Sequence, residues 1–445
     1  MGVLPEQKLA VVRNLVEAAP DRVVGDLRAA LAGAGGDSGL VDVRLLVETE
    51  ARDRQLRNAV FLPIAPLCIG DGRTERLTFP ARALALVWKG LRDQATHEVA
   101  RAAALYEEYQ AEESSPEPFD VLARRAARGV REGNHPRFAA AAELVEQTRP
   151  DGARYFAECL EMTPKVRTAV GRLPDWIQRV TDEDAAIARI AYKDAVAIAE
   201  DAGPRFFDML AAHLRHPWMV LRLISAVMDK PPESYLSGSE LADFGQRVLD
   251  SIDAELGVVE AFDAQGGAAA VKAAGGAVEA VTAQIAEIEG NVELSRDGVW
   301  GAHVARQKKT LARLVEARLR ETDKAVRTAL PTAQVRVGRV TKDTPRLDAP
   351  PSDAAVQKAR TLLAFAQEIR GAANYGGFAA ARAKTMEAVE EFLDTYVEEA
   401  LDYLRVGDAA DPDAARALVR AAADLIAVVR DRQAAELVRR RLSGL

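Results

Sequence analysis

GPRFFDMLAAHLRHPWMVLRLISAVMDK, residues 203–230, decides the fold class, because it is the densest apolar and aromatic run in the chain. It predicts two short helices that meet at the His216-Pro217 dipeptide, since proline is tolerated at the first position of a helix. The first helix is expected to bury Phe206, Phe207, Met209, Leu210 and Leu214. The second is expected to bury Trp218, Leu221, Ile224 and Met228, which follow a helical spacing of three and four residues.

The composition of the whole chain also indicates a helical protein. Of the 445 residues, 49% are hydrophobic, 28% are charged and only 5% are aromatic. Ala, Leu, Glu and Arg, which are good helix formers, are abundant. The excess of Arg over Lys is typical of a GC-rich bacterial genome. We therefore expect an all-α protein with stacked short helices (solenoid-like or a bundle), a long antiparallel helical or coiled-coil hairpin, and a C-terminal helical bundle.

The sequence also argues against several functional classes. A formal net charge of −8 disfavours a general nucleic-acid binder. Cys68 and Cys159 lack metal-ligand spacing, so we expect reduced thiols and no metal site. No Walker loop, Gly-x-Ser-x-Gly elbow, His-Glu-x-x-His or Cys-x-x-Cys motif occurs, and no cofactor is expected. Neither a secretory signal nor an apolar run of roughly 20 residues is present, which predicts a cytoplasmic location.

Breaks in the apolar periodicity predict five parts of the chain. They are an N-terminal helical region at 1–110, a stacked-helix core domain at 119–262, an antiparallel helical hairpin at 267–330, a linker at 331–351 and a C-terminal helical bundle at 352–445. Flexible or exposed breaks are expected at 33–39 and 110–120. Within the core domain, 151–161 and 164–180 are predicted to be separate helices, and Thr181 with Asp184 indicates a capping box.

The predicted hairpin rests on an apolar repeat in its first arm. The repeat alternates between three and four residues, as in a coiled coil, at Val271, Ala274, Val278, Val281, Ile285, Ile288 and Val292. Gly275 and Gly276 interrupt this arm and indicate a bend or a close helix contact. A second copy of the chain is one partner that this hairpin could pair with, to give a homo-oligomer.

Two groups of side chains could form functional sites, but a structural explanation is favoured for each. His213, His216 and Trp218 could line a pocket, but capping of backbone groups at a helix corner is the favoured interpretation. Six carboxylates could hold a metal, but a solvated acidic face is favoured. They are Glu387, Glu390, Glu391, Asp394, Glu398 and Glu399.

The strongest charge asymmetry lies at 306–346, which we call the basic arm. It holds twelve Lys and Arg and four Asp and Glu, a net charge of +8, so the remainder of the chain carries −16. Arg306, Lys308, Lys309 and Arg313 are the candidate residues for an anionic partner, and pairing with the chain's own acidic helix is the alternative. The arm lacks aromatic residues for stacking bases, so nucleic acid is disfavoured, as is an anionic membrane.

These observations favour a non-enzymatic helical scaffold, adaptor or regulatory subunit that binds other proteins in the cytosol. Two alternatives stay open. One is an enzyme built in a helical bundle without a recognisable motif. The other is a protein that binds an anionic surface, either nucleic acid or membrane, through the basic arm.

Overall fold

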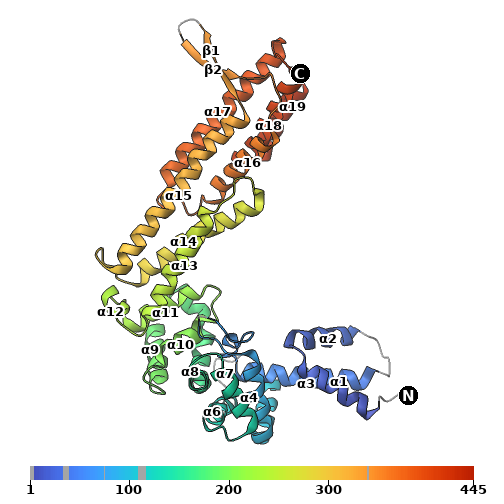
Figure 1. Cartoon of the computed structure of the whole chain (residues 1–445), viewed down its shortest axis with the longest axis vertical. Helices are drawn as coiled ribbons and strands as arrows, with labels where there is room; N and C mark the ends of the chain where they lie inside the picture. The colour runs from blue at the N-terminus through green and yellow to red at the C-terminus, as the bar shows by residue number, and fades with distance from the viewer. Residues whose placement is uncertain (1–4, 34–39, 75, 109–116, 338–339) are drawn as a thin grey trace. The chain divides into compact units, whose positions relative to one another are not determined.

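The structure is a computed structural model, and it describes residues 5–33, 40–74, 76–108, 117–337 and 340–445 (Figure 1). These residues form nineteen α-helices and one small two-stranded sheet, which confirms the predicted all-α fold class. The breaks predicted at 33–39 and 110–120 lie largely outside the described residues. The chain divides into two compact units, residues 1–229 and 230–445, where the sequence predicted five smaller segments.

The first unit contains eleven α-helices and two short 3₁₀ turns in its described residues. The helices are α1 (Glu6–Ala18), α2 (Asp21–Gly33), α3 (Val41–Val60), α4 (Ala81–Gln94), α5 (Thr96–Glu108), α6 (Glu117–Glu132), α7 (Pro136–Glu146), α8 (Gly152–Gln178), α9 (Asp182–Val196), α10 (Gly203–Ala211) and α11 (Val220–Met228). The turns are η2 (Ala65–Leu67) and η3 (Pro217–Met219).

The second unit, over the part that the structure describes, contains eight α-helices and two strands. They are α12 (Glu233–Ser237), α13 (Ala242–Glu260), α14 (Gly267–Asn291), α15 (Val299–Ala329), β1 (Thr332–Val337), β2 (Val340–Pro345), α16 (Asp353–Glu368), α17 (Ala379–Val406), α18 (Pro412–Val429) and α19 (Arg432–Ser443).

Helices close in sequence pack on one another in the first unit. α4 contacts α7, α6 contacts α7 and α8, and α9 contacts α8 and α11. At the beginning of the unit, α3 packs on both α1 and α2. Those three helices share a small core of Val16, Val24, Val47 and Ala51. Most of these helices are too short to be stable alone, so burial between neighbours stabilises the stack.

The stretch at 203–230 forms two helices, with a boundary that differs from the prediction. All five side chains predicted for the first helix are buried. The second helix begins at Val220, because Pro217–Met219 forms the turn η3 instead of the first helical turn. Leu221 and Ile224 are buried as expected, but Trp218 and Met228 are only half-buried. The prediction that Trp218 belongs to the core was therefore wrong.

The two helices predicted at 151–161 and 164–180 are one continuous helix, α8, with Pro164 and Pro174 inside it. A proline removes one backbone hydrogen bond, which usually ends or bends a helix. Here α8 packs on α6 and α7, and this burial stabilises a helix that the local sequence alone disfavours. The capping box of Thr181 and Asp184 is present at the start of α9, as predicted.

One buried ion pair lies inside the first unit. Glu158 and Arg205 are 5% and 6% exposed, and their side chains are paired. Arg205 also donates to Asp201 at 2.8 Å. The guanidinium groups of Arg154 and Arg205 both lie over the ring of Tyr155, at 4.6 and 4.5 Å from its centroid. These contacts place each buried charge beside an opposite charge or an aromatic ring, and a charge buried alone would be costly.

The second unit is built from two groups of four helices that share α15 and α16. α13, α14, α16 and α15 form the first group, and α15, α16, α18 and α17 form the second. α14 and α15 therefore pack mainly on α13 and α16 rather than along each other. The predicted apolar repeat from Val271 to Val292 is buried throughout. Periodicity identified the buried face of α14 correctly, but the helices that cover this face are α13 and α16 rather than α15.

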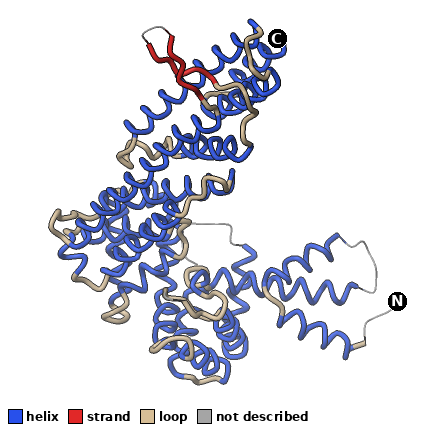
Figure 2. Tube along the Cα trace, turned by 45° about the horizontal axis from the view of Figure 1, so that its top comes forward, coloured by secondary structure: helices blue, strands red, loops and turns tan. Residues whose placement is uncertain are grey.

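The region predicted as a linker at 331–351 contains an antiparallel β-hairpin, visible as the red strands in Figure 2. Its register pairs Thr332 with Pro345 and Val335 with Lys342. Residues 332–337, TAQVRV, include three β-branched residues, Thr332, Val335 and Val337, which favour an extended strand. β2 also contacts α17, so the hairpin is attached to the second unit.

Candidate interaction surfaces

The four predicted anion-binding residues lie on α15, but they do not share one environment. Arg306, Lys309 and Arg313 are exposed. Lys308 is half-buried, with its Nζ 3.1 Å from Glu289 Oε1 and 5.2 Å from the centre of the Tyr375 ring. Lys308 therefore links α15 to α14 within the chain. Unlike the other three residues, it already has an anionic partner.

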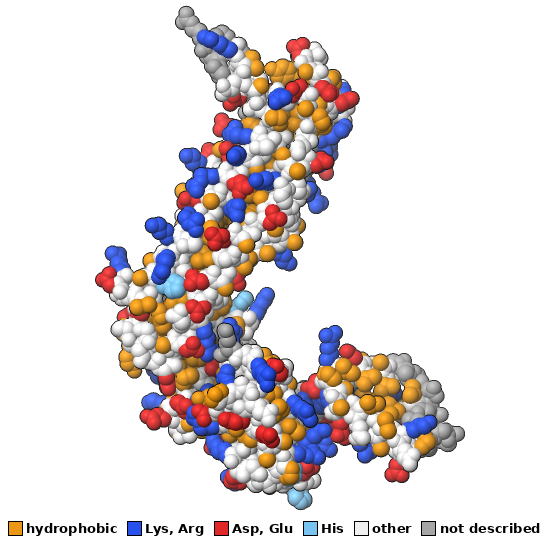
Figure 3. Space-filling model, viewed as in Figure 1, with side chains coloured by type: hydrophobic (Ala, Val, Ile, Leu, Met, Phe, Trp, Pro, Cys, Tyr) orange, Lys and Arg blue, Asp and Glu red, His pale blue; other side chains and the backbone are white. Residues whose placement is uncertain are grey.

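Exposed cations continue along the same side of α15. We call the following six residues the basic stripe: Arg306, Lys309, Arg313, Arg320, Lys324 and Arg327. At 100° per residue their positions fall within a sector of about 60° around the helix axis. The exposed positions of α15 include no Asp or Glu. Figure 3 shows blue side chains along this part of the second unit.

Most of the stripe is not neutralised by other side chains. Arg320 lies 3.7 Å from Glu316, and Arg327 lies 3.1 Å from Asp323. The other four stripe residues make no ion pair with any residue that the structure describes. Their charge is therefore balanced only by solvent and salt in the isolated chain.

Three further cations of the basic arm are paired with nearby carboxylates. Arg318 pairs with Glu321 at 3.0 Å, Arg346 pairs with Asp348 at 2.9 Å, and Lys342 pairs with the carboxylate of Glu399. These cations are therefore paired with carboxylates of the chain itself. The net charge of the arm therefore overstates the positive charge that an external partner would meet.

The acidic face predicted on α17 is largely ion-paired. Arg430 Nη2 lies 2.7 Å from Asp394, and its Nε lies 3.2 Å from Glu390. Arg441 pairs with Glu398, and this hydrogen bond lowers the pKa of that carboxyl group. Among the described residues of the basic arm, Lys342 alone forms an ion pair with this acidic face, so the arm and the acidic helix are not general partners of each other.

The candidate pocket residues His213, His216 and Trp218 contact different groups. His213 Nε2 lies 3.2 Å from the carbonyl oxygen of Pro63 and donates to it, while burial lowers the pKa of the ring. The ring of His216 is stacked on Trp218, with centroids 5.4 Å apart. His213 thus binds a backbone carbonyl oxygen 150 positions away in the sequence rather than a group at its own helix corner.

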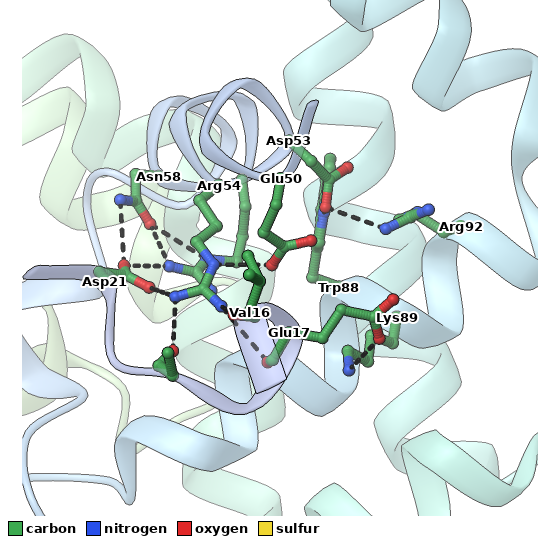
Figure 4. Close-up of polar contacts among 12 residues, drawn as sticks. Val16, Glu17, Asp21, Glu50, Asp53, Arg54, Asn58, Trp88, Lys89 and Arg92 are labelled. Carbon is green, nitrogen blue, oxygen red and sulfur yellow. Dashed lines mark hydrogen bonds and ion pairs between the residues drawn. The ribbon is translucent and has the colours of Figure 1, made fainter. Parts of the chain in front are cut away.

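The sequence did not point to Arg54, the central side chain of a cleft in the first unit. Arg54 is 7% exposed, and its guanidinium donates to the carbonyl oxygens of Val16 at 2.9 Å and Ala19 at 2.7 Å. It also donates to Asp21 and Glu50, at 2.9 and 2.7 Å (Figure 4). α1 has no basic residue in its own last turn, so Arg54 supplies the positive charge that its C-terminus favours.

The cleft has a volume of about 1070 Å³ and lies between α1, α3 and α4. Polar contacts cross it: Trp88 Nε1 donates to Asp53 at 3.0 Å, and Lys89 Nζ donates to Glu17 at 3.3 Å (Figure 4). Cys68 also lines it, and burial raises the pKa of this thiol to about 12. The charged groups in Figure 4 neutralise one another, and a protonated thiol is a poor nucleophile.

The helices on one side of this cleft expose an unusual amount of apolar surface. We call the following residues the apolar surface of α1–α3: Val11, Leu15, Val23, Leu27, Val41 and Leu45. Leu15 and Leu45 are each 66% exposed. Figure 3 shows orange side chains gathered over this part of the first unit. Large apolar side chains exposed together in this way are typical of a binding surface.

Comparisons with known proteins do not assign the chain to a family. No protein-family model, no curated protein and no solved structure matches the chain. Within the described residues, no three His, Cys, Asp or Glu side chains are grouped as metal ligands would be. In the same part of the chain, no helix has the length and apolar character needed to cross a bilayer.

Proposed function

We propose that the chain is a non-enzymatic helical adaptor that binds a partner protein through the apolar surface of α1–α3. The observation that carries the proposal is the exposure of Leu15 and Leu45, two large apolar side chains on neighbouring helices. Covering apolar area stabilises a complex by roughly 25 cal/mol for each Å² removed from water. A partner that supplies its own apolar side chains gains most from such a surface.

The alternative of an enzyme has less support. A catalytic pocket usually gathers polar groups whose protonation is tuned to the reaction. The cleft around Arg54 instead holds charged groups that are paired with each other, and its cysteine is kept protonated by burial. Arg54, its most buried charged side chain, donates hydrogen bonds to carbonyl groups at the end of α1 and to two carboxylates. This arrangement supports a structural role for the cleft.

The proposal is tested by affinity capture with the full chain and two matched double variants. Leu15→Ser with Leu45→Ser alters the apolar surface. Val406→Ser with Leu437→Ser removes apolar side chains of similar exposure, 72% and 60%, from the second unit. We expect a protein that co-purifies with the wild type to be retained by the second variant and reduced roughly tenfold or more with the first.

Equal recovery of that protein with both variants would overturn the proposal. Light scattering of the purified chain provides a second check. If the wild type forms a dimer that Leu15→Ser with Leu45→Ser converts to a monomer, a second copy of the chain covers this surface. The adaptor function would then be wrong.

A further inference from the structure

The basic stripe has a geometry that points to a particular kind of partner. Its residues are separated by three, four, seven, four and three positions, which is the alternation that keeps side chains on one side of a helix. From Arg306 to Arg327 the helix rises by about 32 Å. The stripe is therefore long, straight and narrow.

The helices beside α15 limit how wide an anionic partner can be. α13 and α17 both pack on α15. Asp253 of α13 is exposed, and its Oδ2 lies 2.8 Å from His303 Nε2 of α15. Glu391 of α17 is exposed and lines the same cavity as Arg327. Carboxylates thus border the stripe at two points, with Asp253 near its beginning and Glu391 beside Arg327 at its end.

This border disfavours broad anionic surfaces. A phospholipid bilayer or a nucleic-acid duplex would place phosphates over the flanking carboxylates as well as over the cations, and like charges repel. An α-helix is only about 10–12 Å wide with its side chains, so it can contact the stripe alone. Ala317 is exposed between Arg313 and Arg320, and its small side chain lets a second helix approach closely.

We propose that the basic stripe binds an acidic helix of a partner protein. The partner helix carries Asp or Glu at alternating spacings of three and four residues, so that each carboxylate meets one Lys or Arg of α15. Interhelical pairs of this kind set partner choice and orientation in coiled coils. The stripe shares no residue with the apolar surface of α1–α3, and failure of either proposal leaves the other standing.

Binding should depend strongly on salt. Exposed ion pairs contribute about 0.2–1 kcal/mol each, so several must act together to give measurable affinity. Salt screens such pairs over about 8 Å at physiological ionic strength. Charge attraction also speeds the encounter between the partners, so ionic strength should act mainly on the association rate.

The test uses the full chain and fluorescence anisotropy with two labelled probe peptides. Both are helical peptides of Glu, Ala and Leu with the same composition. In the first, Glu repeats along one face with the spacing of the stripe, and in the second, Glu is spread around the helix. We expect the first peptide to bind at low ionic strength and the second to bind at least several-fold more weakly.

Two quadruple variants then test the stripe itself. Arg306→Gln, Lys309→Gln, Arg313→Gln and Lys324→Gln remove the stripe cations that lack ion pairs. Lys272→Gln, Arg360→Gln, Lys384→Gln and Arg420→Gln remove the same charge from exposed positions on α14, α16, α17 and α18. The stripe variant should weaken binding of the first peptide roughly tenfold or more, and the control variant by no more than about twofold.

Circular dichroism establishes that both variants remain folded before binding is measured. Three outcomes overturn the proposal: equal binding of the two peptides, equal binding by the two variants, or no binding at low ionic strength. A fourth uses phosphatidylserine vesicles and duplex DNA as probes. If either binds more tightly than the peptide and depends on the stripe, the stripe recognises phosphate surfaces and the acidic-helix proposal is wrong.

Discussion

The carboxylate of Glu233 accepts the backbone N–H of Trp300 at 2.7 Å, although the two residues are 67 positions apart. Glu233 belongs to α12 and is 4% exposed, and it also accepts from Ser295 at 3.0 Å and Gly301 at 3.2 Å. The N-cap of α15 is Gly298, which has no side chain to cap the helix. Glu233 supplies that cap and fixes the start of the helix that carries the basic stripe.

Replacing Glu233 by Ala should lower the free energy of unfolding of the second unit by roughly 2–4 kcal/mol, because buried N–H groups lose a charged acceptor. Chemical denaturation followed by circular dichroism measures the loss, and hydrogen exchange should show faster exchange at the start of α15. Glu293→Gln, on an exposed neighbouring side chain, serves as the control. An unchanged denaturation midpoint for Glu233→Ala would contradict this role.

Two glycines of α13 should respond in opposite ways to substitution by Ala. A methyl group at Gly245 would overlap the indole ring of Trp300, whereas nothing lies within 4 Å of one at Gly257. Gly245→Ala should destabilise the chain by about 1–3 kcal/mol through overpacking. Gly257→Ala should stabilise it by up to about 1 kcal/mol through helix propensity. Thermal melting of both variants checks the pair, and equal shifts would rule out close packing of α13 on Trp300.

Arg54→Met should loosen α1 more than the rest of the first unit. The substitution leaves the carboxylates of Asp21 and Glu50 without their buried cation and removes the donor to the α1 carbonyl groups. Breaking such a contact costs about 3–5 kcal/mol when the remaining charge stays buried, and less where it reaches water. Hydrogen exchange at residues 6–18 should accelerate strongly. Arg44 lies on α3, as Arg54 does, but at an exposed position. Arg44→Met should therefore leave exchange at residues 6–18 unchanged.

Asp201 should make part of the stability of the first unit dependent on pH. Its hydrogen bond with Arg205 lowers the pKa of the carboxyl group from 3.8 to about 2, with Arg154 acting in the same direction. A pKa that is lower in the folded state stabilises the protein above the unfolded value, and this contribution is lost as the pH falls through about 2.

Asp201→Asn should therefore cost less than about 1 kcal/mol at neutral pH, since half of the Asp201 side chain is exposed to screening solvent. The difference between variant and wild type should shrink as the pH is lowered from about 5 towards 2. Denaturant titrations at neutral and acidic pH measure it. A difference that stays constant across this range would mean that the ion pair does not contribute.

The sequence identified buried faces better than packing partners. The repeat from Val271 to Ile288 is buried as predicted, because apolar spacing depends only on the geometry of its own helix. Which helix covers that face depends on the whole chain, and here it is α13 and α16 rather than α15. Gly275 illustrates the limit: it indicated a close contact, which the structure shows with Glu368 of α16, but not the identity of the contact.

The same difference holds for the candidate surfaces: the sequence reveals local charge patterns but not the contacts between helices. Arg306, Lys309 and Arg313 could be found from their spacing, because exposed charge at helical intervals is a local pattern. The pairing of Lys308 with Glu289 depends on how α14 meets α15 and could not be read from the sequence. Arg54 was one charge among several on α3, and its role appears only when α1 lies beside it.

The most direct test of the adaptor function is hydrogen exchange of the full chain with and without the captured partner protein. We expect slower exchange in α1, α2 and α3 when the partner is bound, because the apolar surface around Leu15 and Leu45 is covered. Unchanged exchange in these three helices, with protection confined to other parts of the chain, would contradict it.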